Sequence, residues 1–148
     1  MRALVQRVAW AKVEVDGDVI GQIDRGLLVY LGAGKGDGVA ERTYVLSKIL
    51  GLRIFENDAG KMDRSIVDIG GSLLVVSQFT LYADLSRGRR PSFDLAMLPE
   101  EAERAYDAFV HEARAQKIMV ATGKFRANMQ VSSTNDGPVT IWIDSAKV

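Results

Sequence analysis

Apolar and charged residues alternate in the first part of the chain, which is the pattern of a strand with one buried face. Val13 and Val15 alternate with charged neighbours and are followed by Asp16-Gly17. Glycine adopts positive φ values without steric cost, so this dipeptide predicts a tight hairpin turn. The apolar residues after the turn predict the returning strand: Val19, Ile20 and Ile23.

Two continuous apolar runs, residues 27–31 and 73–76, predict strands that are buried on both faces. Residues 32–38, which follow the first run, contain four glycines in seven positions. A phosphate-binding loop would need a Gly-Lys-Ser/Thr ending, which this segment lacks. We therefore interpret it as a connecting loop.

Two segments have the residue spacing of amphipathic helices. Tyr44, Val45 and Ile49 fall on one face of a helix over residues 39–50, with Asp37 as its N-cap. A second helix begins at Pro99, because proline is tolerated in a first helical turn and the acidic residues that follow favour a helix N-terminus. Its apolar stripe comprises Ala102, Ala105, Tyr106, Phe109 and Ala113.

Apolar alternation returns near the end of the chain. Residues 139–143 predict a strand, and residues 129–133 predict its partner. Between them, Asn135-Asp136-Gly137-Pro138 is a cluster of turn-forming residues and predicts a hairpin turn. The chain has no internal repeat and no linker. We therefore expect one α+β domain spanning residues 1–148.

The composition narrows the possible chemistry. The 148 residues include no cysteine and one histidine, His111, which lies off the apolar stripe of its helix. Disulfide scaffolds, thiol nucleophiles, zinc sites and histidine-based triads are therefore excluded, and we expect no metal and no cofactor. If the protein is an enzyme, it has to work through positioning and backbone dipoles.

The charge pattern narrows the partners. The chain has 19 basic and 19 acidic residues, so its net charge of zero argues against an indiscriminate polyanion binder but allows a local basic patch. No stretch approaches the roughly 20 apolar residues that span a bilayer. The first residues, interrupted by Arg2 and Arg7, do not resemble a signal peptide. We expect a cytoplasmic protein with no membrane partner.

Two polar segments carry the candidate chemistry. Ser77-Gln78-Phe79-Thr80 follows an apolar strand where that strand should end, and residues 135–140 read Asn-Asp-Gly-Pro-Val-Thr. Taken alone, the first is a strand end with satisfied polar groups and the second is an ordinary hairpin turn. A Gly-Pro bond can also be cis at modest cost, and a retained cis proline usually has a purpose. Both interpretations of each segment stay open at this point.

Together, the two segments closely resemble the D-aminoacyl-tRNA deacylase family, whose signature pairs Ser-Gln-x-x-Leu with Asn-x-Gly-Pro-x-Thr. The resemblance extends over essentially the whole chain. One departure is Arg126, because members of the family usually carry a small residue there. The other matching segments are residues 1–8 (MRALVQRV), 48–55 (KILGLRIF), 88–93 (GRRPSF), 122–125 (TGKF) and 129–131 (MQV).

The resemblance implies a homodimer of compact, β-barrel-like sheets with two main helices packed on each, and two active sites at the interface. The implied substrates are D-aminoacyl-tRNA and glycyl-tRNA; DNA, which lacks the 2′-hydroxyl, is not an expected partner. The implied site residues are Ser77, Gln78, Phe79 and Thr80 for catalysis, Gly137 and Pro138 for chiral selection, Phe125, Met129, Asn135 and Thr140 for substrate binding, and Arg87, Arg89 and Arg90 for tRNA phosphates.

The resemblance also implies a mechanism that needs no histidine. Backbone N–H groups around Phe79 and Thr80 would stabilise the oxyanion, and the tRNA 2′-hydroxyl beside the ester would assist. Thr80 as nucleophile is the alternative, although nothing in the sequence activates its hydroxyl. The carbonyls of Gly137 and Pro138 would hold the α-ammonium and occupy the space of an L side chain. Two other functions stay open: a non-catalytic dimeric RNA-binding module and a general esterase of small acyl esters.

Overall fold

The first strand, β1 (Arg2–Val15), is the centre of the sheet in the computed structural model, which describes residues 1–147. Along one edge it pairs with β8 (Gln130–Asp144) over almost its whole length. Along the other edge it pairs first with β3 (Gly26–Gly32) and then with β2 (Asp18–Ile23). These pairings are all antiparallel, and the turn between β1 and β2 lies at Asp16-Gly17, as predicted.

Parallel strands extend the sheet beyond β3. The order is β2-β1-β3-β6-β7, with β6 (Ser72–Ser77) parallel to β3 and β7 (Met119–Thr122) parallel to β6. A separate small hairpin is formed by β4 (Phe55–Glu56) and β5 (Met62–Arg64). Short 3₁₀ turns, η1 (Phe79–Tyr82) and η2 (Ser145–Lys147), follow β6 and β8.

The sheet curls until β2 approaches β7. Gly21 of β2 lies so close to β7 that an added Cβ would stand 2.3 Å from the carbonyl oxygen of Thr122. No side chain fits between the two strands at this position, so glycine is required for the approach. The predicted barrel-like sheet is confirmed, and it is nearly closed.

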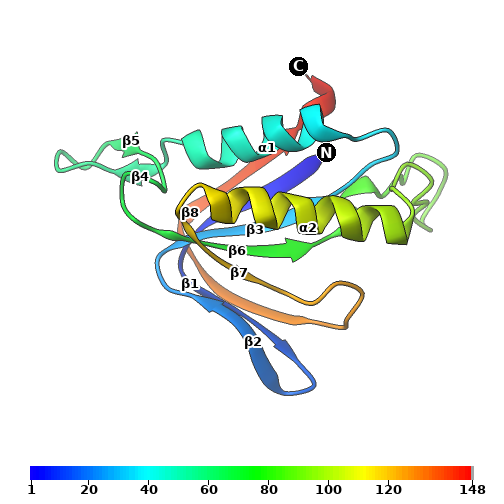
Figure 1. Cartoon of the computed structure of the whole chain (residues 1–148), viewed down its shortest axis with the longest axis horizontal. Coiled ribbons are helices and arrows are strands. Elements are labelled where there is room, and N and C mark those ends of the chain that lie inside the picture. Colours follow the sequence, from blue (N-terminus) through cyan, green and yellow to red (C-terminus); the bar gives the residue numbers. More distant parts are fainter. Residues whose placement is uncertain (148) are drawn as a thin grey trace.

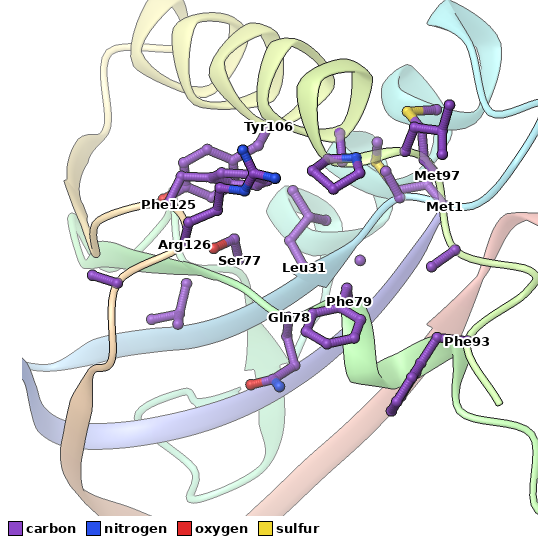
Figure 2. A pocket seen from close by; sticks show the side chains of 18 of the residues that line it. Met1, Leu31, Ser77, Gln78, Phe79, Phe93, Met97, Tyr106, Phe125 and Arg126 are labelled. Carbon is purple, nitrogen blue, oxygen red and sulfur yellow. The ribbon is translucent and has the colours of Figure 1, made fainter. Parts of the chain in front are cut away.

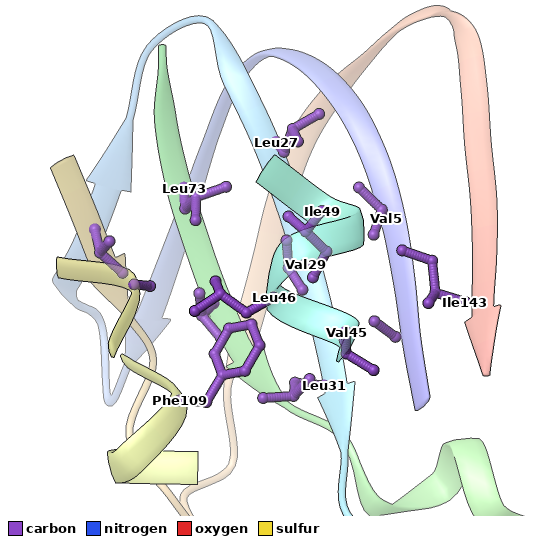
Figure 3. Close-up of a cluster of buried hydrophobic side chains, with 14 of the residues drawn as sticks. Val5, Leu27, Val29, Leu31, Val45, Leu46, Ile49, Leu73, Phe109 and Ile143 are labelled. Atoms are coloured by element: carbon purple, nitrogen blue, oxygen red, sulfur yellow. The ribbon is translucent and has the colours of Figure 1, made fainter. Parts of the chain in front are cut away.

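Two helices, α1 (Val39–Gly51) and α2 (Pro99–Ala115), pack on one face of this sheet (Figure 1). Their buried side chains meet alternate residues of β1, β3 and β6 in one apolar cluster (Figure 3). A second cluster lies on the opposite face, inside the curl, and includes Leu28, Leu74 and Val76. Strands β3 and β6 are therefore buried on both faces, as their continuous apolar runs predicted.

The helix predictions are confirmed apart from one cap. Helix α2 begins at Pro99, and His111 lies exposed on its outer face. Helix α1 is capped by Gly38 rather than by Asp37, so the predicted cap is wrong. The Asp37 carboxylate instead accepts hydrogen bonds from the Gly34 N–H at 2.6 Å and the Tyr82 hydroxyl at 3.1 Å. These partners turn its side chain away from the helix.

The predicted hairpin near the end of the chain is also wrong. Residues 129–133 and 139–143 do not pair with each other; both belong to the region of β8 and lie along β1. The turn-forming residues make a bulge within β8, because the register jumps from Gln6 opposite Thr140 to Val8 opposite Asn135. Proline has no N–H for the ladder, so the chain bulges around Pro138 and then resumes its direction.

No helix within the described residues 1–147 has the length and apolar character required to cross a bilayer.

Candidate active site

A pocket of about 790 Å³ opens where β3 and β6 end (Figure 2). Its floor comes from strand residues such as Leu31, Val76 and Ser77, and its walls come from α2, the segment before α2 and the loop between β7 and β8. The lining is largely apolar, with the polar side chains of Ser77 and Gln78 at the end of β6 and charged side chains of Lys35, Asp94 and Arg126 elsewhere around it. This combination is typical of a site that holds an organic ligand and positions one reacting group.

Ser77, Gln78 and Phe79 line the polar end of the pocket, whereas Thr80, the next residue, is not among the lining residues. The Gln78 N–H donates to the Leu31 carbonyl at 2.8 Å, and the chain then turns into η1 at Phe79. The first N–H groups of a helix have no partner within it, so the N–H groups of Phe79 and Thr80 are free of helical hydrogen bonds. Both residues are exposed. The Phe79 ring makes an edge contact with Phe93, with centroids 4.8 Å apart.

The hydroxyl of Thr80 has an amide as its neighbour. The Gln78 side-chain amide donates a hydrogen bond to Thr80 Oγ1. An amide does not remove a proton from a hydroxyl, and among the side chains that the structure describes, no acidic or basic group contacts this oxygen. The local chemistry therefore aligns the hydroxyl without activating it.

Tyr106 and Phe125 form the opposite wall. The Tyr106 hydroxyl donates to the Val75 carbonyl at 2.7 Å, and its ring lies 6.1 Å from that of Phe125. Burial raises the pKa of the Tyr106 phenol well above its ordinary value, so the group stays protonated and keeps its donor role. Met129 also lines this side, and its sulfur accepts the Lys124 N–H at 3.4 Å.

The Gly137-Pro138 segment is an exposed part of the bulge in β8. The peptide bond is cis, and Gly137 has φ of 129°. Asn135 braces the bulge from within, because its Oδ1 accepts the Val139 N–H at 3.0 Å and its Nδ2 donates to Thr140 Oγ1, also at 3.0 Å. The backbone of this segment is thus fixed by side chains of its own motif.

Arg7 braces the same bulge from β1. Its side chain is almost fully buried, with 6% of the residue exposed. Nε donates to the Asp136 carbonyl at 3.1 Å and lies 3.3 Å from the Asp136 carboxylate, while Nη1 donates to the Ile54 carbonyl. One guanidinium therefore links β1, the segment before β4 and the residue preceding Gly137.

Within one copy of the chain, the two predicted motifs are far apart. Strands β8, β1, β3 and β6 are successive neighbours, which separates β8 from β6 by three strand spacings, roughly 14 Å. Across the sheet, Ser77 of β6 is level with Leu31 of β3, Ala3 of β1 and Ile143 of β8. Gly137 is displaced from that level because it lies six residues from Ile143 along β8. Neither Gly137 nor Pro138 lines the pocket.

The other predicted site residues divide in the same way. Ser77, Gln78, Phe79, Phe125 and Met129 line the pocket, whereas Asn135 and Thr140 belong to the bulge in β8. Arg87, Arg89 and Arg90 are exposed in the loop between η1 and α2, beyond the pocket lining. Within the described residues, no three histidine, cysteine or acidic side chains come together as metal ligands would.

Comparisons with known proteins identify the family. A family model described as D-Tyr-tRNA(Tyr) deacylase matches residues 4–144. The chain belongs to this deacylase family. It is 56% identical over 148 residues to a D-aminoacyl-tRNA deacylase of Sorangium cellulosum (strain So ce56), covering 99% of each chain. It is 58% identical over 146 residues to one of Variovorax paradoxus (strain S110), covering 99% of this chain and 100% of that one.

Solved structures agree with the deacylase fold. One described as "c-Myc DNA Unwinding Element Binding Protein" superposes with a TM-score of 0.92 and 42% identity, covering 97% of this chain and 98% of the other. A second, described as a probable eukaryotic D-amino acid tRNA deacylase, has a TM-score of 0.80 at 18% identity, covering 96% and 97%. The predicted family, fold and enzyme class, a D-aminoacyl-tRNA deacylase, are confirmed.

Two features of this deacylase site were not predicted from the sequence. Ala3 and Val5 are alternate residues of β1 that point into the core, and Arg7 is the next residue in this series. A charged residue at a core-facing position is unusual, so the sequence did contain a sign that Arg7 has a special role. Phe93 belongs to the matching segment 88–93, but that segment has no periodicity, so its contact with Phe79 was not predicted.

Arg7→Met should lower the free energy of unfolding by about 2–3 kcal/mol, because it leaves the buried Ile54 carbonyl and the Asp136 carbonyl without their donor. Methionine retains an unbranched side chain, so the loss is mainly one of hydrogen bonds. Urea unfolding followed by circular dichroism measures it.

The matched control for this change is Arg53→Met. The ion pair of Arg53 with Asp63 is exposed on both sides, and its loss should cost less than about 1 kcal/mol. Equal, small effects of the two substitutions would contradict a bracing role for Arg7.

Proposed function

We propose that this protein removes D-amino acids from tRNA by hydrolysing the ester that joins them to the terminal ribose. The observation that carries the proposal is the largely apolar pocket that Ser77, Gln78 and Phe79 line at the end of β6, in a chain of the deacylase family. Water adds to the ester carbonyl, the bond to the ribose oxygen breaks, and that oxygen takes a proton. The products are a D-amino acid and tRNA with a free terminal ribose.

The terminal adenosine fits the apolar interior of the pocket. Tyr106 and Phe125 offer aromatic surface, and Met129 offers a polarisable thioether, both of which suit the face of a nucleobase. With the base held there, the ribose ester lies toward Ser77 and Phe79 at the polar end. Positioning of this kind accounts for much of the rate that an activated ester requires.

The N–H groups of Phe79 and Thr80 are the proposed oxyanion hole. They precede the first hydrogen bond of η1, and both residues are exposed, so the groups are accessible to a ligand. Backbone donors held in this way stabilise the charge that develops on the carbonyl oxygen. The ribose 2′-hydroxyl adjacent to the ester assists proton transfer, which removes the need for a side-chain base.

Chiral selection is proposed for the Gly137-Pro138 segment of a second subunit. The segment is exposed and braced by Arg7 and Asn135, yet it lies on a different strand from the pocket of its own chain. A homodimer would bring it to the partner's pocket. There its carbonyls would accept hydrogen bonds from the α-ammonium and fill the space of an L side chain. Glycyl-tRNA, which has no side chain, would escape this exclusion.

The sheet face opposite the helices supports a dimer. Leu4 of β1 and Trp142 of β8 are paired neighbours on this face, and Trp142 is 43% exposed. Gln6 and Thr140 continue the same face toward the bulge, and Phe79 is also exposed at 56%. Exposed aromatic side chains next to hydrogen-bonding groups are typical of protein interfaces.

The exposed loop that carries Arg87, Arg89 and Arg90 is the proposed contact for tRNA phosphates. Among the described residues, none of the three forms an ion pair with an acidic side chain, so their guanidinium groups are available to the RNA backbone.

The activity is tested with tyrosyl-tRNA carrying either enantiomer, and with glycyl-tRNA. We expect release of D-tyrosine and glycine, and no release of L-tyrosine above the uncatalysed rate, as measured by loss of acid-precipitable labelled amino acid. Binding of all three without cleavage would favour a non-catalytic RNA-binding module. Cleavage of simple acyl esters that lack adenosine would favour a general esterase.

Phe79→Pro tests the oxyanion hole, because proline lacks the N–H and is tolerated at the first position of a helix. We expect it to lower kcat about 100-fold more than Phe79→Ala, which loses the ring but retains the N–H. Single-turnover deacylation of D-tyrosyl-tRNA measures both.

Thr80→Ala tests the alternative mechanism, in which the Thr80 hydroxyl is the nucleophile. It removes the hydroxyl and retains the N–H, so its rate should stay within about tenfold of wild type. Abolished cleavage with intact binding, or an acyl group trapped on Thr80, would instead identify Thr80 as the nucleophile.

Gly137→Ala tests chiral selection. The new Cβ would stand 2.9 Å from Arg7 Nη2 and 2.8 Å from a Val139 methyl, at a φ that L residues rarely adopt. The segment has to shift, so we expect D-tyrosyl-tRNA hydrolysis to fall about 100-fold and discrimination against the L-enantiomer to weaken. Gly17→Ala is the matched control, since Gly17 also has positive φ but is distant from the pocket and has open space around it.

Mixing variants then tests whether the site is shared. A heterodimer of Phe79→Pro and Gly137→Ala subunits contains one site in which both motifs are intact, if the two motifs come from different chains. Activity recovered on mixing is the expected result. No recovery from co-purified heterodimers, or wild-type selectivity of Gly137→Ala, would refute the shared site.

A further inference from the structure

Arg126 has an unusual backbone conformation at the rim of the pocket. Its φ is 62°, and it occupies the third position of a turn that the Ala127 N–H closes on the Lys124 carbonyl at 3.2 Å. Turns with positive φ at this position favour glycine, because a Cβ there meets the backbone. An arginine at this position is therefore strained.

The two other non-glycine residues with positive φ in the described part of the chain occupy ordinary places. Asp16 lies in the hairpin turn after β1, and Lys117 follows the C-terminus of α2, where this conformation is common. Arg126 differs from both because its side chain lines the pocket, on the same side as Tyr106 and Phe125 (Figure 2). Strain at a ligand site indicates that the side chain has a role there.

The guanidinium of Arg126 has spare hydrogen-bonding capacity. Its ion pair within the described residues is with Glu100 at 3.5 Å, and the two side chains are 59% and 68% exposed. An exposed pair at this distance contributes little, so an anionic ligand can displace it. Arginine presents a planar fork of N–H donors that matches two oxygens of a phosphate.

We propose that Arg126 binds the phosphate on the 5′ side of the terminal nucleoside, exchanging Glu100 for the RNA. The proposal rests on the function proposed above. The ester lies toward Phe79, and the base lies against Phe125, so the 5′ carbon of the ribose leaves by the rim of the pocket. Arg126 is the cation beside Phe125 on that rim.

Two other assignments of the bound anion and its partner are possible, and the experiment below distinguishes them from the proposal. Among the described residues, Lys35 is the other basic side chain that lines the pocket; it lies on the segment after β3 and could take the phosphate instead. The oxyanion bound by Arg126 could also be the side-chain carboxylate of an acidic D-amino acid. We favour the phosphate because it is present in every tRNA substrate, whereas a carboxylate is not.

The test uses two small esters that differ by one phosphate: 3′-O-D-tyrosyl-adenosine and the same ester of adenosine 5′-monophosphate. In the wild-type protein, we expect the phosphorylated ester to have a KM about tenfold lower. Arg126→Gln should remove this difference by raising the KM of the phosphorylated ester alone, with kcat unchanged. Arg126→Lys should restore part of it.

A stability readout separates binding from folding. Arg126→Gly relieves the backbone strain, so it should raise Tm by about 2–4 °C while losing the phosphate preference. Lys117→Gly is the matched control: it should raise Tm by a similar amount and leave both KM values unchanged. A merely structural role for Arg126 would change Tm without changing the ratio of KM values.

The failures are distinguishable. If the wild-type protein cleaves neither ester nor D-tyrosyl-tRNA, the proposed function is wrong. If it cleaves both esters with equal KM, or if Lys35→Gln rather than Arg126→Gln removes the difference, the assignment to Arg126 is overturned. It is also overturned if Arg126→Gln impairs D-aspartyl-tRNA but not D-asparaginyl-tRNA, because the bound anion is then the carboxylate.

Discussion

Hydrogen bonding along both edges of β1 determines where the functional segments lie. Because β8 follows one edge while β3 and then β2 share the other, β1 belongs to both halves of the sheet. The change of partner lets the sheet curl, which brings Gly21 of β2 against Thr122 of β7. The same pairing leaves one sheet face for the helices and directs the ends of β3 and β6 into the pocket.

The buried guanidinium of Arg7 connects this framework to the chemistry. It projects from β1 into the bulge of β8, so the backbone before Gly137 is fixed by the central strand itself. Residues 77–80 are fixed by a different contact, the hydrogen bond from the Gln78 N–H to β3. Each motif is rigid in its own chain, and neither depends on the other for its shape. Such independence suits a site that two subunits would complete together.

Local patterns predicted the parts of the fold that local physics decides. The apolar stripe of α2, its Pro99 start and the doubly buried strands β3 and β6 all follow from residue spacing. The bulge in β8 was not predictable in this way, because turn residues at 135–138 favour a reversal unless a long strand such as β1 keeps the chain extended. Asp37 does not act as a cap because its carboxylate is held by tertiary partners, the Met1 ammonium at 2.6 Å and the Tyr82 hydroxyl at 3.1 Å.

For the candidate site too, the sequence indicated the residues, but their arrangement in space depends on the tertiary structure. Its residues were indicated by a resemblance between two short motifs and those of a family. Their separation on strands β6 and β8 was invisible until the sheet order was known. The core-facing position of Arg7 could have indicated that this residue has a structural role. Its contact with Asp136, however, joins residues that are 129 positions apart in the sequence, so it depends on the pairing of β1 with β8.

The pairing of β1 with β8 also has a consequence for folding. The register joins Arg2 to Asp144 and Glu14 to Gln130, so these contacts close loops that contain most of the chain. Contacts of such long range slow the search for the native state. On the ribosome, one edge of β1 stays without its β8 partner until residues 130–144 have been synthesised, and an unpaired apolar edge invites aggregation. The β1–β2 hairpin and the pairing with β3, which form among residues 2–32, would protect the other edge meanwhile.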